Sequence, residues 1–262
     1  MSTRDRTAAA GPDRGLLLVG HGSREPLGIE EFRETARLVA KMARGWAVEP
    51  CFLEFTQPTI AAGFETLAAR GVRRVATVPL LLFSAGHAER DIPAAVAAVA
   101  AEHPRIVVGQ SEHLGCHEAL LALSDSRYLE ALAERPPLPA DETVLVVVGR
   151  GSRDAQATAE MRAFARLRHE RTWVAQARTA FIAMADPPLD RVLDEVVACG
   201  CTRVVVQPHF LFAGVLLDRM RRVVDDYARR HPDRDWVMTR HLGPSELLAE
   251  AILDRAAVVL AP

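Results

Sequence analysis

The chain has 262 residues, enough for two domains of ordinary size, and about half of them are apolar. Its 32 basic and 34 acidic residues give a formal net charge of −2, without the basic excess typical of nucleic-acid-binding proteins. No apolar run approaches the roughly 18 residues of a membrane span, so we expect neither nucleic acid nor a membrane as a partner. The four cysteines lack C-x-x-C spacing and the first residues lack the apolar region of a secretory signal, which predicts a cytoplasmic protein with reduced thiols.

An internal repeat divides the chain into two halves. The stretch GLLLVGHGSRE, residues 15–25, returns as VLVVVGRGSRD, residues 144–154. Gly20 and Gly149 are 129 residues apart, and the same offset relates Pro58 to Pro187. A proline-rich stretch, ERPPLPADE, separates the two copies and suits an exposed linker. We therefore predict a disordered tail (1–14), an N-terminal domain (15–133), a linker (134–142) and a C-terminal domain (143–262).

In chain order, the first half alternates short apolar runs with stretches of helical spacing. The runs are GLLLVG (15–20), VEPCFLEF (48–55), RRVATVPLLLF (73–83) and RIVVGQ (105–110), and all are typical of strands buried on both faces. Apolar residues at helical spacing begin at Phe32, Ile60 and Ile92 between these runs. The alternation predicts an α/β fold with two tandem, pseudo-equivalent domains, each a parallel sheet flanked by helices. We expect the two domains to face each other across a cleft.

Three polar residues of the first half are replaced by other residue types in the second. His21 corresponds to Arg150, Glu54 to Ala183 and His87 to Leu216, although the surrounding glycines and prolines are retained. Each follows a predicted strand, and in parallel sheets ligands bind beyond the carboxyl ends of the strands. Two imidazoles and a carboxylate are a typical ligand set for a divalent metal with open positions. We therefore predict His21, Glu54 and His87 as both metal ligands and catalytic residues.

The motifs GHGSR (20–24), FLE (52–54) with Pro58 four residues after Glu54, and PLLLFSAGHAERDIP (79–93) resemble those of class II tetrapyrrole chelatases. The chain is most similar to the long, duplicated CbiX/SirB type of sirohydrochlorin chelatase. The resemblance implies insertion of cobalt or ferrous iron into sirohydrochlorin, in cobalamin or sirohaem biosynthesis, by a catalytic N-terminal domain beside a degenerate C-terminal one. It also assigns metal handling to His21, His87 and Glu54.

Some long members of this family carry a histidine-rich tract and a cysteine motif near the C-terminus, and this chain ends in AILDRAAVVLAP with neither. We expect no iron–sulfur cluster and no tightly bound cofactor, because the divalent metal is a substrate. The tetrapyrrole is the expected partner, and the fused duplication favours a monomer or a weak homo-oligomer.

Sirohydrochlorin carries carboxylates around a flat ring, so its site needs cationic and N–H donors. Ser23 and Arg24 in the first copy, and Ser152 and Arg153 in the second, lie where a helix is predicted to begin, and helix N-termini favour anions. Arg150 replaces a histidine and is expected to face the cleft and bind a substrate carboxylate. The alternative for the Gly-x-Gly-Ser-Arg loop is that it only shapes the turn in both halves.

Two other functions remain open from the sequence. A metal-dependent hydrolase could use the same two histidines and Glu54, with Glu89 or Asp91 as a general base. A non-catalytic carrier of metal or tetrapyrrole would need the same residues without turnover. His113 and His117 resemble a second metal cluster, but a strand-end or helix-cap role explains them more simply, and His209 is interpreted as a core residue of a strand.

Overall fold

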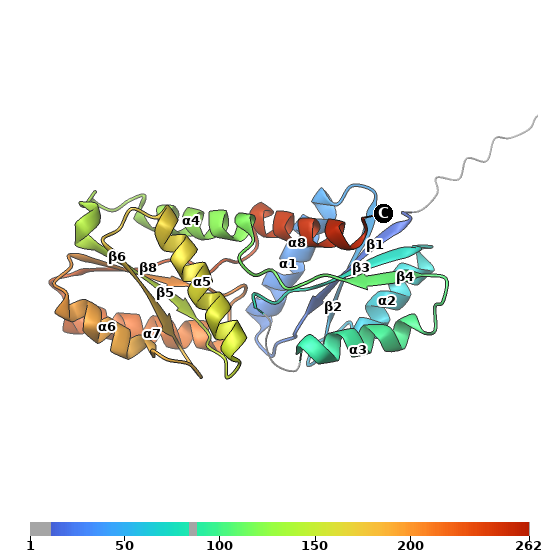
Figure 1. The fold of residues 1–262 in the computed structure, drawn as a ribbon, viewed down its shortest axis with the longest axis horizontal. Helices are drawn as coiled ribbons and strands as arrows, with labels where there is room; N and C mark the ends of the chain where they lie inside the picture. The colour runs from blue at the N-terminus through green and yellow to red at the C-terminus, as the bar shows by residue number, and fades with distance from the viewer. Residues whose placement is uncertain (1–11, 84–87, 262) are drawn as a thin grey trace, which may run out of the picture.

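The computed structural model describes residues 12–83 and 88–261, which form two lobes side by side (Figure 1). The first parallel sheet has the strand order β2-β1-β3-β4 and the second has the equivalent order β6-β5-β7-β8. In the first half, the elements are β1 (Arg14–Gly20), α1 (Pro26–Met42), β2 (Trp46–Phe52), α2 (Ile60–Ala69), β3 (Arg74–Pro79), α3 (Ala88–Ala100), β4 (Val107–Gln110) and α4 (Glu118–Leu132). In the second half, a short 3-10 helix (Ala140–Glu142) precedes β5 (Thr143–Gly149), α5 (Ala155–Arg171), β6 (Gln176–Phe181), α6 (Leu189–Ala198), β7 (Arg203–Pro208), α7 (Val215–Arg230), β8 (Asp235–Met238) and α8 (Glu246–Val259). The predicted α/β fold with two duplicated parallel sheets is confirmed.

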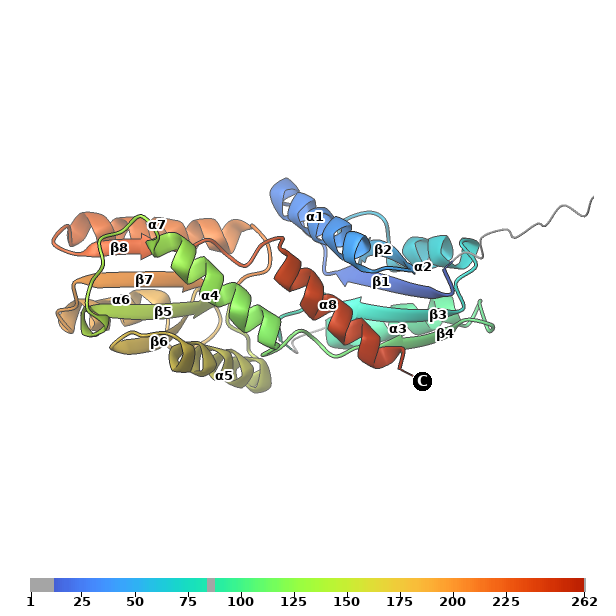
Figure 2. The ribbon, with the colours of Figure 1, turned by 90° about the horizontal axis from the view of Figure 1, so that it is seen from above.

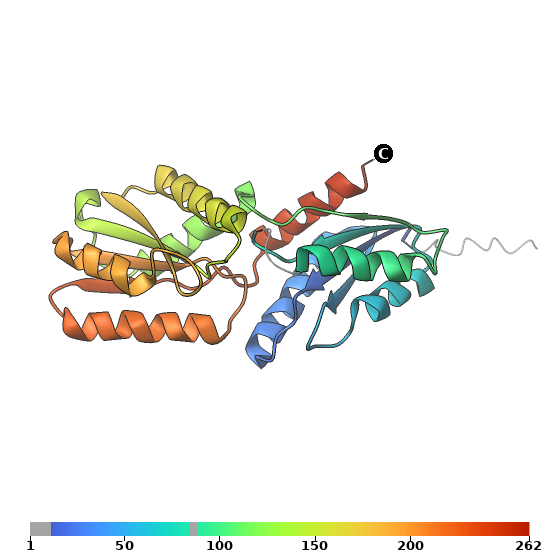
Figure 3. The same cartoon turned by 60° about the horizontal axis from the view of Figure 1, so that its bottom comes forward.

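Both sheets are covered by helices on both faces, which explains the continuous apolar runs of the strands. In β1, Leu16 and Leu18 face one layer of helices while Leu17 and Val19 face the other, and all four are fully buried. On the second face of this sheet lie α2 and α3, which Figure 3 brings to the front. None of the helices in the described part of the chain has the length and apolar character of a bilayer span.

The last helix of each half covers the sheet of the other half. Helix α8 packs on β3, β4 and α1, and its Ile252 is buried in one cluster with Leu16 and Leu18 of β1. Helix α4 packs on α5 and β8, and its Tyr128 contacts the cluster that contains Leu145 of β5. Figure 2 shows the two helices staggered side by side, with α4 over β5 and β7 and α8 over β3. We call the first sheet with α1, α2, α3 and α8 the N-lobe, and the second sheet with α4, α5, α6 and α7 the C-lobe.

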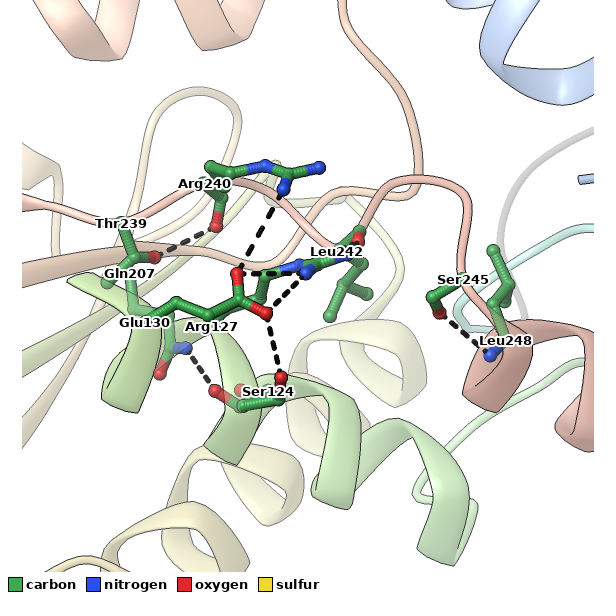
Figure 4. Close-up of polar contacts among 10 residues, drawn as sticks. Ser124, Arg127, Glu130, Gln207, Thr239, Arg240, Leu242, Ser245 and Leu248 are labelled. Carbon is green, nitrogen blue, oxygen red and sulfur yellow. Dashed lines mark hydrogen bonds and ion pairs between the residues drawn. The ribbon is translucent and has the colours of Figure 1, made fainter. Parts of the chain in front are cut away.

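An arginine anchors each exchanged helix to the lobe that it covers. Arg127 of α4 donates from Nε and Nη2 to the carbonyl oxygen of Leu242, at 3.0 and 2.7 Å, and Nη1 pairs with Glu130 (Figure 4). Arg255 of α8 donates to the carbonyl oxygen of Leu114 at 3.0 Å. Leu242 and Leu114 occupy equivalent loops after the fourth strands, so the exchange follows the pseudo-symmetry of the two halves.

A histidine–glutamate pair also crosses between the lobes on each side. His241 Nε2 lies 2.9 Å from a carboxylate oxygen of Glu31 in α1, and His113 Nε2 lies 3.0 Å from Glu160 in α5. The backbone N–H of Ala213 donates to Glu31 at 2.6 Å. Burial alone would raise the pKa of the Glu31 carboxyl, but the hydrogen bonds from His241 and Ala213 and the nearby positive charges hold that pKa below its usual value.

The ends of the predicted segments fall as follows. Most of the predicted tail (1–14) lies outside the described residues, and Arg14 already begins β1. In the predicted linker (134–142), the carbonyl oxygen of Pro136 accepts a hydrogen bond from Arg203 of β7 at 2.8 Å. The linker therefore contacts the C-lobe sheet, while the domain boundaries themselves stay a prediction.

Candidate active site

Two of the three predicted metal ligands meet at the carboxyl edge of the N-lobe sheet. His21 follows β1 and Glu54 follows the neighbouring strand β2, and His21 Nδ1 lies 3.2 Å from Glu54 Oε1. Their side chains are each about one-third exposed, at 34% and 35%. The N–H of Glu54 donates to the carbonyl oxygen of His21 at 3.1 Å, which ties the two loops together at the site.

A glycine after the first strand of each sheet allows the loop after that strand to approach the loop after the second strand. Gly22 has a φ of +98°, and a Cβ atom built there would lie 1.8 Å from the carbonyl oxygen of Glu54. Gly151 has a φ of +86° and its Cβ would lie 1.9 Å from the carbonyl oxygen of Ala183. Any side chain would clash with backbone at both positions, so the second glycine of each Gly-x-Gly has a structural role.

His87, the third predicted ligand, lies in residues 84–87, outside the described residues. Within residues 12–83 and 88–261, no group of three or more histidine, cysteine or carboxylate side chains has the arrangement of a metal site. The described part of the site is therefore the His21–Glu54 pair, and the role of His87 stays a prediction.

A cavity of about 600 Å³ lies where the two lobes meet, with His21 on its wall. The N-lobe contributes His21 and the segment from Leu80 to Phe83, and the C-lobe contributes the loop from Gly149 to Arg153. The remaining lining residues all belong to the C-lobe: Ala157, Thr158, Met161, Phe181, Met184, His209, Phe210 and Leu211. The walls are therefore largely apolar, with a few polar groups, as in pockets that bind small organic molecules.

Arg150 and Arg153 supply positive charge on the C-lobe wall of this cavity. Within the described ranges, no carboxylate lies within 4.0 Å of either guanidinium. Arg24, which the sequence predicts as a substrate-binding residue of the first half, is not among the lining residues. Its guanidinium lies 5.0 Å from the centre of the Phe55 ring. The arginines that line the cavity therefore come from the C-lobe, whereas His21 comes from the N-lobe.

The two serines of the repeated loop serve the turn itself. Ser23 Oγ accepts a hydrogen bond from the N–H of Glu25, and Ser152 Oγ accepts one from the N–H of Asp154, both at 3.0 Å. Asp154 caps α5 by accepting from the N–H of Gln156 at 2.8 Å. An acidic side chain thus occupies the N-terminus of α5, which leaves arginine side chains as the better candidates for anion binding.

The sequence interpretation of His209 as a core residue describes its burial but misses its place on the cavity wall. The residue is 3% exposed and its ring packs 3.9 Å from that of Phe164 and 5.3 Å from that of Phe83, measured between centroids. Neither ring nitrogen has a hydrogen-bond partner among the described residues. Burial lowers the pKa of His209 to about 3, so the ring is neutral. Its position directly after β7 is the signal that could have placed it at the site.

His113 and His117 have the structural roles that the sequence favoured over a second metal site. His117 caps α4, since its Nδ1 accepts a hydrogen bond from the N–H of Ala119 at 3.2 Å, and its Nε2 lies 3.5 Å from Asp254. His113 forms the inter-lobe pair with Glu160. Both imidazoles thus support the contact between the lobes.

The sequence model of the CbiX family matches residues 15–131 and 144–259, one copy in each half. The chain belongs to the CbiX family. A sirohydrochlorin cobaltochelatase of Priestia megaterium is 31% identical over 247 residues, which cover 93% of this chain and 79% of the relative. A sirohydrochlorin ferrochelatase of Bacillus subtilis (strain 168) is 27% identical over 246 residues, 92% of this chain and 90% of the relative.

Solved structures of the same fold bind metals. SirB from Bacillus subtilis with Fe³⁺ matches with a TM-score of 0.80 and 28% identity over 93% of this chain and 94% of that chain. SirB from Bacillus subtilis subspecies spizizenii in complex with cobalt matches with a TM-score of 0.74 and 26% identity over the same shares. The family predicted from the motifs is confirmed.

Proposed function

We propose that this protein inserts a divalent metal, cobalt or ferrous iron, into sirohydrochlorin. The observation that carries the proposal is the His21–Glu54 pair beside an inter-lobe cavity that His21 lines from the N-lobe and Arg150 and Arg153 line from the C-lobe. Relatives over most of the chain are named sirohydrochlorin cobaltochelatase and ferrochelatase. The metal is a substrate here, and the product belongs to cobalamin or sirohaem biosynthesis.

The reaction replaces two pyrrole N–H protons by one metal ion, so the site must hold the ion briefly and accept protons. An imidazole can present a nitrogen lone pair to a metal and then take up a proton. Glu54 holds the His21 ring in one orientation through the 3.2 Å contact and adds a negative charge that attracts the dication. An incomplete protein ligand set suits a metal that must be released into the ring. His87 is our candidate for the second imidazole.

The C-lobe binds and orients the tetrapyrrole in this proposal. Arg150 and Arg153 would each offer a planar guanidinium that can donate two parallel hydrogen bonds to a substrate carboxylate. The apolar wall formed by Leu80 to Phe83 and Phe210 accommodates the flat ring between the lobes. The division of labour matches the repeat, since the half with Arg150 in place of His21 also lacks the equivalents of Glu54 and His87.

The test mixes purified protein with sirohydrochlorin and Co²⁺ or Fe²⁺ and follows the absorption spectrum over many turnovers. We expect metallation well above the non-enzymatic rate, with more product than protein. Product limited to one equivalent would indicate a carrier, and no acceleration with any divalent metal would refute the proposal. We also propose a cytoplasmic location. A monomeric or weakly associating chain fits the proposal, because one chain supplies both walls of the cavity.

A further inference from the structure

The same unusual turn follows the second strand of both sheets. Phe55 has a φ of +62°, and the N–H of Thr56 donates to the carbonyl oxygen of Glu54 at 2.7 Å. Met184 has a φ of +53°, and the N–H of Ala185 donates to the carbonyl oxygen of Ala183 at 2.7 Å. A hydrogen bond across three residues with positive φ at the centre is a classic-type γ-turn, which is rare and strained for any residue with a side chain.

Packing does not explain why a large apolar side chain lies at the centre of each turn. The exposed fraction is 60% for Phe55 and 50% for Met184, so neither side chain is buried in a core. Glycine would adopt the same backbone conformation without strain, and neither copy has it. Strained, exposed apolar residues at equivalent positions of both lobes suggest a function in ligand binding.

Both side chains lie at the candidate active site. Met184 lines the inter-lobe cavity from the C-lobe. The Phe55 ring lies beside that of His21 in the N-lobe, with 6.5 Å between centroids and 20° between the ring planes. The Arg24 guanidinium lies 5.0 Å from the centre of the same ring, which fixes a positive charge next to it. The two turns thus display an aromatic ring and a thioether from opposite lobes.

We propose that Phe55 and Met184 are substrate-binding residues that pack against the macrocycle of the tetrapyrrole, an inference that rests on the proposed function. An aromatic ring parallel to that of His21 suits stacking on a flat conjugated ligand beside the metal-handling pair. A thioether is polarisable and adapts to an aromatic face. Binding of the ring by both lobes explains why the turn is retained in the C-lobe, where Glu54 has been replaced by Ala183.

The experiment separates strain from binding by comparing two substitutions at the same position. Phe55→Ala removes the ring and retains the strained backbone, whereas Phe55→Gly removes both. We expect each variant to bind metal-free sirohydrochlorin about tenfold more weakly, measured by absorbance titration, and the glycine variant to melt at a higher temperature than the alanine variant. Met184→Ala and Met184→Gly should follow the same pattern. Trp173→Ala is the matched control, because the Trp173 side chain is 90% exposed. Trp173 precedes β6, at the amino end of the strand, whereas Met184 follows the carboxyl end.

The inference is overturned if the Phe55 and Met184 variants bind sirohydrochlorin as tightly as the natural protein, or if Trp173→Ala weakens binding equally. It is also overturned if affinity falls only in variants that melt lower than the natural protein. Failure of the natural protein itself to metallate sirohydrochlorin would refute the proposed function. Normal metallation with unchanged affinity in all four variants would refute this inference alone.

Discussion

Replacing Ile252 by alanine should destabilise the N-lobe, although Ile252 lies in the C-terminal half of the sequence. The side chain is fully buried in α8 against the cluster that contains Leu16 and Leu18. The substitution removes three carbon atoms, worth about 0.8 kcal/mol each in lost burial. A residual cavity adds to this loss, and the better helix propensity of alanine offsets a few tenths of a kcal/mol. We expect the free energy of unfolding to fall by about 2–3 kcal/mol.

Urea denaturation measures the total, and hydrogen–deuterium exchange read by mass spectrometry locates it. In Ile252→Ala, peptides that cover β1 and β3 should lose protection at lower urea concentrations than peptides that cover β5 and β7. The mirror variant Tyr128→Ala in α4 should show the reverse order, because Tyr128 packs on the C-lobe cluster. Loss of protection confined to the C-lobe strands in Ile252→Ala would refute the helix exchange.

Three further predictions concern the site and the lobe contact. His21→Ala should lower kcat for metallation by about 100-fold, the scale of a lost acid–base group, while circular dichroism shows an intact fold; a kcat within a few-fold of normal would exclude His21 from the chemistry. Arg150→Ala should raise KM for sirohydrochlorin about tenfold, or about 1.4 kcal/mol, with little change in kcat, and a collapse of kcat instead would mean that the roles of the two halves are reversed. Glu31→Gln should lower the free energy of unfolding at neutral pH. The pKa of the Glu31 carboxyl is lower in the folded protein than in the unfolded chain, where it is about 4.3, so its ionised form stabilises the fold above that pH. This contribution is lost as the pH falls through the folded pKa. Urea titrations from pH 7 to pH 3 should therefore show the two proteins converging at acid pH, and a difference that grows on acidification would contradict the linkage.

Apolar runs predicted the strands well, but they did not mark where the strands end. The apolar run from Arg73 to Phe83 predicts one strand, whereas β3 ends at Pro79 and Leu80 to Phe83 line the cavity. A cavity wall for a flat ligand needs the same apolar residues as a sheet, so hydropathy alone cannot separate them. Hydropathy likewise places Phe55 in a predicted strand, although β2 ends at Phe52.

The repeat indicated a candidate site but could not assign the last helices. Comparison of the two copies singles out His21 and Glu54. The C-terminal copy retains the same loops without these side chains, so the loops do not need them to fold. It could not show that α4 and α8 change places, since two similar halves present nearly equivalent apolar faces to either helix. Only the three-dimensional contacts, such as Arg255 with the carbonyl oxygen of Leu114, distinguish the two arrangements.

The exchanged helices reverse the order in which the lobes can be completed as the ribosome makes the chain. All elements of the C-lobe lie in one continuous stretch, from Glu118 to Met238. The N-lobe instead combines residues 14–110 with α8, which leaves the ribosome after every element of the C-lobe. Until then, α1 alone covers the face of β1 that carries Leu16 and Leu18, so the nascent N-lobe exposes the apolar surface that α8 later buries. The lobe that carries the His21–Glu54 pair is thus begun before the C-lobe and completed after it.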